Sequence, residues 1–93
     1  MTEEEVIQKL KDEGYDKVYA YSAEPNEDDP EHSHEFDTKV HVISGEIGIR
    51  KLDGDRITDY KLKAGDECEV LRNTKHEALC GPEGCRYIVA EKH

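Results

Sequence analysis

The strongest constraint on the fold is a series of turn signals that divides residues 38–91 into short segments. Glycine, asparagine and aspartate gather at these turns, which fall at 45, 53–55, 64–66, 73–74 and 81–84. Between the turns, apolar residues tend to recur at every second position, which is the period of a half-buried β-strand. We expect strands over 18–22, 38–44, 46–52, 57–63, 68–71, 77–80 and 86–91, with an acidic loop over 24–29. Short strands at this spacing indicate an all-β sandwich or barrel.

Only the first residues have a helical pattern. Thr2 and Glu5 have the spacing of a capping box, in which two side chains satisfy free backbone amides of the first turn. A narrow apolar stripe follows, and Gly14 supplies the left-handed residue that ends many helices. We therefore expect one short helix over 2–13 that lies outside a barrel of about residues 17–91.

Composition limits the size of the core and the kinds of partner. Residues 1–93 suffice for one domain with a small core, and only 34% of them are hydrophobic. We expect a homodimer, because the strand over 38–44 has apolar residues on both faces, with Val40 and Val42 on one and Ile43 on the other. The net charge of −10 argues against nucleic acids and anionic membranes as partners, and is compatible with cations and neutral small molecules.

The sequence also bears on the compartment. It has no apolar run of the length that predicts a transmembrane helix, and its acidic N-terminus lacks the pattern of a secretion signal. Three cysteines, an odd number, fit a reducing compartment, so we expect a cytoplasmic protein. Cys80 and Cys85 flank a turn at 81–84, where a disulfide is geometrically feasible; two reduced cysteines packed as small apolar residues are the alternative.

Three histidines are the candidate metal ligands. His32 and His34 are one residue apart, so on an extended strand both imidazoles project from the same face. His76 lies far along the chain. If the fold brings His76 back to the other two, three neutral nitrogen donors converge and can hold a divalent metal ion.

The spacing of these residues resembles that of the small single-domain cupins. Their first motif is H-x-H, three or four residues, Glu, six residues, Gly, and their second runs from a Gly through Pro and Gly to a His and then an Asn. Five residues are in register with these motifs: His32, His34, Gly45, Gly65 and His76. The resemblance covers about residues 17–91. It implies a double-stranded β-helix, a small jelly-roll barrel, in which the three histidines point inward as metal ligands.

The sequence departs from the cupin motifs at positions that bear on the site. The family's ligand Glu falls at Thr38, whose hydroxyl is a poor ligand but shares strand parity with the histidines and could bond a metal-bound water. Asp37 is the candidate substitute carboxylate if a bulge reverses its parity. Cys80 stands where the family often has Asn, and could face the cavity.

Three neutral ligands leave a divalent ion with its full charge and with open positions for water or substrate. Zinc suits such a site, and the ligands alone do not distinguish it from iron, nickel, manganese or copper. We expect a metal-binding cupin that binds or senses a small molecule in its barrel. One alternative is a metal-dependent enzyme, dioxygenase- or isomerase-like, since some cupins that oxidise thiols with dioxygen also use three histidines. A second alternative is a structural dimer whose site has decayed, as loss of the carboxylate at Thr38 would allow.

Overall fold

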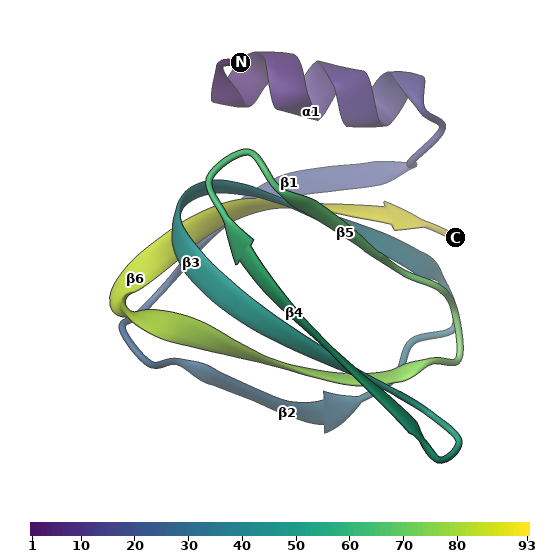
Figure 1. Cartoon of the computed structure of the whole chain (residues 1–93). Helices are drawn as coiled ribbons and strands as arrows, with labels where there is room; N and C mark the ends of the chain where they lie inside the picture. The colour runs from purple at the N-terminus through teal and green to yellow at the C-terminus, as the bar shows by residue number, and fades with distance from the viewer.

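The computed structural model describes residues 1–93 and has one helix followed by six antiparallel strands (Figure 1). The elements are α1 (Glu3–Asp12), β1 (Lys17–Ala23), β2 (Asp28–His32), β3 (Asp37–Asp53), β4 (Arg56–Lys63), β5 (Glu67–Val70) and β6 (Lys75–Lys92). The all-β prediction with one short N-terminal helix is confirmed. The capping box between Thr2 and Glu5 is present at the start of α1, and Gly14 has a φ of +98° just after its end.

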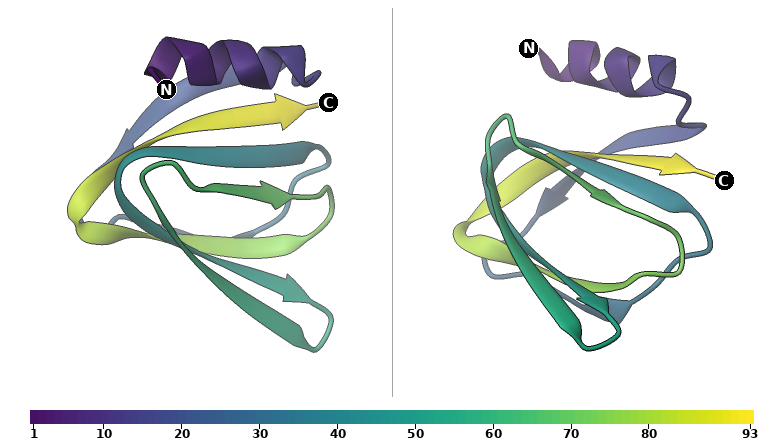
Figure 2. Two further views of the ribbon diagram at one scale, coloured as in Figure 1. Left: turned by 45° about the horizontal axis from the view of Figure 1, so that its top comes forward. Right: turned by 45° about the vertical axis from the view of Figure 1, so that its right-hand side comes forward.

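Two long strands organise the barrel. β3 pairs with β6 along nearly its whole length, residues 37–45 with 85–92 and residues 47–52 with 75–80. Between these two stretches the ladder is irregular and both strands bend, as Figures 1 and 2 show. β1 and β5 extend the first stretch into the helix-side sheet, and β2 and β4 extend the second stretch into the opposite sheet. The two sheets face each other, which is the arrangement of a double-stranded β-helix.

The bend explains why the strand boundaries predicted at the glycines were wrong. Gly45 has a φ of +76°, and a Cβ at this position would overlap the carbonyl oxygen of Gly84 on β6. Glycine is therefore required here so that the two strands can cross closely as they turn. The pairs of strands predicted on either side of Gly45, and on either side of 81–84, are single strands that continue through the bend.

The acidic segment before the histidines was predicted as a loop over 24–29, but residues 28–32 form β2. β2 pairs only with β6, so it is an edge strand. Pro30 is compatible with this place, because a residue without an N–H is tolerated where one side of the strand has no partner. Edge pairing of this kind brings His32 directly opposite His76.

Apolar residues form two clusters, one inside the barrel and one under α1. The barrel cluster consists of Val40, Val42, Ile47, Ile49, Leu62, Cys68, Val70, Cys80 and Cys85. The second cluster consists of Val6, Leu10, Tyr15, Ile88 and Ala90, with Ile43 packed against it. α1 therefore covers the outer face of the helix-side sheet, including the Ile43 side chain that suggested a dimer contact (Figure 2). α1 has 10 residues and is too short and too polar to cross a membrane.

Candidate metal centre

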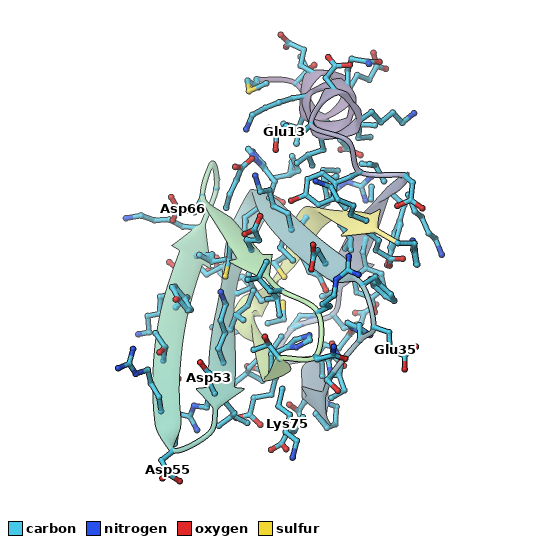
Figure 3. All side chains as sticks on the ribbon, turned by 90° about the vertical axis from the view of Figure 1, so that its right-hand side faces the viewer. Glu13, Glu35, Asp53, Asp55, Asp66 and Lys75 are labelled. Atoms are coloured by element: carbon cyan, nitrogen blue, oxygen red, sulfur yellow. The ribbon has the colours of Figure 1, made fainter.

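The three histidines meet at the end of the barrel opposite the bend, where β2 ends and β6 begins. Figure 3 faces this end of the molecule, and Glu35, in the connection from β2 to β3, points outward there. The ring centroids of His32 and His76 lie 4.2 Å apart, and that of His34 lies 4.7 Å from His32 and 5.3 Å from His76. One nitrogen from each ring lies within 4.8 Å of the other two. Metal–nitrogen bonds of about 2.1 Å need ligand atoms roughly 3 Å apart, so small side-chain rotations suffice to complete such a site.

Backbone carbonyls fix which nitrogen two of the three rings present. Nδ1 of His32 lies 2.6 Å from the carbonyl oxygen of Pro30, and Nδ1 of His76 lies 2.9 Å from that of Thr74. A carbonyl oxygen only accepts, so both Nδ1 atoms donate and carry the proton. Nε2 of each ring is then the free donor atom for a metal, which is the usual outer hydrogen-bonding pattern of metal-binding histidines.

His34 is held from its backbone and by its neighbour in the loop. Its carbonyl oxygen accepts a 2.7 Å hydrogen bond from the amide of Asn73, a residue with a φ of +62°. The imidazole stacks on Phe36 with centroids 4.7 Å apart and planes 13° from parallel. The turn at Asn73 therefore positions a candidate ligand that lies about forty residues earlier in the chain.

Burial keeps two of the histidines in the neutral form. Burial, and then the neighbouring His32 and His76, lower the pKa of His34 below its ordinary value. Burial also lowers the pKa of His76, although its hydrogen bond to Thr74 opposes the shift. The lowered pKa values favour the neutral form of both imidazoles, which is the form that binds metal ions.

The histidines lie at a cavity of about 410 Å³. Its lining residues are Tyr19, Tyr21, Glu27, Asp28, Asp29, His32, His34, Thr38, Val40, Ile47, Ile49, Val70, His76, Ala78, Tyr87, Val89 and Glu91. Nine of these 17 residues are hydrophobic, so a ligand in the cavity would meet apolar walls beside a few polar groups.

Thr38 lines the same cavity, as its strand parity predicts. It is 8% exposed, and its Oγ1 is the one buried side-chain oxygen or nitrogen without a hydrogen-bond partner. An unpaired buried hydroxyl costs about 1–3 kcal/mol, which a ligand or a metal-bound water within reach would recover. This orphaned atom and the neutral nitrogen donors fit a hydrated metal ion.

The two other residues proposed for this region lie elsewhere. Asp37 accepts hydrogen bonds from the backbone and the side chain of Arg72, which hold its pKa below the usual value, and it does not line the cavity. Cys80 is buried in the barrel cluster, where its Sγ lies 3.0 Å from Sγ of Cys85. Both cysteines are free thiols, and burial followed by the contact with Cys80 raises the pKa of Cys85 to about 12.

Sequence reasoning missed Glu91, the one largely buried carboxylate of the cavity. Glu91 is 7% exposed and lies directly across the ladder from Thr38. Its Oε2 accepts a 2.9 Å hydrogen bond from the hydroxyl of Tyr19, and burial together with this bond raises the pKa of Tyr19 to about 12. One sequence feature pointed to it: Glu91 alternates along the strand with Tyr87 and Val89, so the three side chains share the strand face that lines the cavity.

The comparisons with known proteins agree on the fold. No protein-family model and no curated protein matches the sequence. A cupin domain of Drosophila melanogaster CENP-C is similar with a TM-score of 0.74 at 15% identity, over 81% of this chain and 59% of that chain. The formate complex of Lactobacillus farciminis oxalate decarboxylase has a TM-score of 0.76 at 18% identity, over 82% and 23% of the two chains.

A third structure is an uncharacterised Klebsiella pneumoniae protein with a double-stranded β-helix domain. It has a TM-score of 0.67 at 27% identity, over 81% of this chain and 64% of that chain. The chain thus spans less than two thirds of each of these three structures. Topology, strand register and these likenesses lead to one conclusion: the chain has the fold of a small cupin.

Proposed function

We propose that this protein binds one divalent metal ion through His32, His34 and His76, and binds or senses a small molecule in the adjoining cavity. The observation that carries the proposal is the convergence of three ring nitrogens within 4.8 Å, at the wall of a cavity of about 410 Å³. The outward bonds of two Nδ1 atoms and the lowered pKa values of His34 and His76 support it further.

A metal held by three neutral histidines would act as a Lewis acid with positions left for water or ligand. The protein's own part is to present Nε2 of His32 and His76 from two strands and a ring nitrogen of His34 from a loop, and to surround the site with apolar walls. Thr38 would supply a hydroxyl to a group at the metal. The apolar residues deeper in the barrel, Ile47 and Ile49 among them, would exclude water from one side of a bound molecule.

A metal-dependent enzyme using the same site is a second candidate, and one observation favours it. General acid–base catalysis needs a group within hydrogen-bond reach of the reacting molecule, and Glu91 lines the cavity with Tyr19 beside it. Decay of the site into a purely structural one is less well supported, because the three histidines remain clustered without the family carboxylate.

Elemental analysis of untagged protein tests the metal proposal. Purified protein exposed to zinc, iron(II) and nickel is expected to hold about one ion per chain, and a His32→Ala, His76→Ala variant is expected to hold none, because one imidazole is a weak site. Ser33→Ala is the matched control, since Ser33 is exposed between the two ligands and should leave uptake unchanged. No stoichiometric metal in the unaltered protein under any of these conditions would overturn the proposal.

A further inference from the structure

The side chains that line the cavity carry an excess of negative charge, which does not come from the three histidines. Four of its lining residues are carboxylates, Glu27, Asp28, Asp29 and Glu91, and none is lysine or arginine. Asp28 and Asp29 are exposed, so water and salt screen them. Glu91 is buried, and its charge acts on the cavity with little screening.

Glu91 lines the same cavity as the three histidines without belonging to their cluster. The group of ligand atoms that lie within 4.8 Å of one another contains only the three imidazoles. Oε2 of Glu91 accepts from Tyr19, and its Oε1 lies 3.4 Å from Nε2 of His93. A carboxylate has about four lone-pair directions, so Glu91 retains acceptor capacity toward a molecule in the cavity.

We propose that Glu91 is the anionic recognition group of this cavity, and that the ligand bound beside the histidines is a neutral or cationic hydrogen-bond donor, such as an alcohol or an amine. Anions such as carboxylates and phosphates are disfavoured. The proposal rests on the proposed function, since it concerns what binds next to the metal.

Three observations carry it. The residue opposite Glu91 in the ladder, Thr38, has a buried hydroxyl without a partner, so both groups present hydrogen-bonding atoms to the same space. No lysine or arginine lines the cavity to receive an anion. Tyr19 donates to Glu91 and holds the carboxylate in place.

The test uses full-length protein loaded with cobalt(II), whose visible spectrum reports a change in the atoms bound to the metal. Two probes are titrated, azide as the anion and imidazole as the neutral molecule. In Glu91→Gln, which removes the charge and keeps the shape, azide should bind about tenfold more tightly, because a buried unit charge several ångströms away repels an anion by at least that factor. Imidazole should bind no more tightly to this variant than to the unaltered protein, because the probe has no net charge to be repelled and its N–H loses a charged acceptor.

Glu77→Gln is the matched control. It removes the same charge from β6, but Glu77 points away from the cavity and pairs with Arg50, so azide affinity should stay unchanged. Tyr19→Phe is a second variant in case Glu91→Gln does not fold. Tyr19→Phe leaves the charge of Glu91 in place and removes the hydroxyl that donates to it. Azide should therefore bind to this variant no more tightly than to the unaltered protein.

The outcomes separate the two proposals. Failure of the protein to take up cobalt overturns both the metal site and this inference. Normal cobalt uptake with equal azide affinity in Glu91→Gln and Glu77→Gln overturns the role of Glu91 alone. Tighter azide binding by Tyr19→Phe than by the unaltered protein would also contradict the inference.

Discussion

At the scale of single residues, Thr38 and Glu91 are a cross-strand pair in the ladder of β3 and β6, and both line the cavity. Thr38 is where the resemblance to the cupin motif predicts a carboxylate, and the buried carboxylate of Glu91 lines the same cavity directly opposite it on the neighbouring strand. Relative to that motif, the negative charge would lie on the cavity wall and not among the ligands. A metal bound by the histidines would retain more of its positive charge than one with a carboxylate ligand.

Replacing Thr38 with valine separates folding from binding. Valine has nearly the same shape and no hydroxyl, so in the presence of a chelator the variant should be more stable by about 1 kcal/mol, because an unpaired buried hydroxyl is removed. Added zinc should stabilise it less than it stabilises the unaltered protein, because the hydroxyl no longer bonds a metal-bound water. Urea denaturation with chelator and with zinc measures both effects.

Thr58→Val is the control, since Thr58 lies on β4 outside the cavity and should show no difference in its response to zinc. A Thr38→Val protein that is less stable than the unaltered one in chelator would mean that the hydroxyl has a partner in solution.

The histidine cluster could be predicted from the sequence, but Glu91 could not. The spacing of His32, His34 and His76 predicts the cluster, because the cupin motifs give the positions of these histidines in the sequence relative to the turn glycines. Glu91 has no motif, and a glutamate near the end of a last strand is expected to be exposed. Its burial follows from its place opposite Thr38 in the ladder, and its spacing along β6 does not by itself show which strand β6 pairs with there.

At the scale of elements, α1 is attached to the barrel by charges as well as apolar contacts. Lys9 of α1 donates a 2.8 Å bond to Glu67 of β5, and His41 of β3 lies 2.7 Å from the same carboxylate oxygen. His41 does not belong to the histidine cluster and is buried beneath the helix. The capping box predicts where α1 begins, but the sheet face it covers depends on these long-range contacts.

Glu67→Gln tests this attachment. Burial raises the pKa of Glu67, but hydrogen bonds from His41 and Lys9 outweigh it, so its pKa in the folded protein lies below the usual value. A carboxylate with a lowered folded pKa contributes stability above its unfolded pKa of about 4.3, and this contribution is lost as the pH falls through the folded value. The variant should be less stable by about 1 kcal/mol at pH 7.

Denaturation in chelator at pH 7 and at pH 3 measures the effect, and the difference from the unaltered protein should shrink at the lower pH. Glu83→Gln, at an exposed position in the bend of β6, is the control and should be neutral at both. A Glu67→Gln difference of equal size at the two pH values would show that the carboxylate's charge is not what holds the helix.

At the scale of the whole molecule, we propose a homodimer that uses the outer face of the opposite sheet. α1 covers the outer face of the helix-side sheet, so Ile43 no longer requires a second chain. The opposite sheet has no helix over it, and Leu79 of β6 is 53% exposed there. A chain with few hydrophobic residues gains stability by covering such a face.

Gel filtration at micromolar concentration should give about twice the monomer mass of 10.6 kDa. Leu79→Glu should shift the protein to the monomer, because a charge would be buried without a partner at the interface. Leu71→Glu, an equally exposed leucine in the turn after β5, should leave the dimer intact. A clean monomer for the unaltered protein would count against the dimer.

The continuity of β6 has a consequence for how the protein folds. β6 pairs with β1, β2 and β3, and its register joins Asp37 to Lys92, so most of the barrel forms only when its last strand arrives. Such non-local pairing makes folding slow, because long loops close before their contacts are gained. The same strand brings His76 to His32. An unfolded or partly synthesised chain therefore has no assembled metal site, and a metal ion would be captured as the last event of folding and would stabilise the whole barrel through that one step.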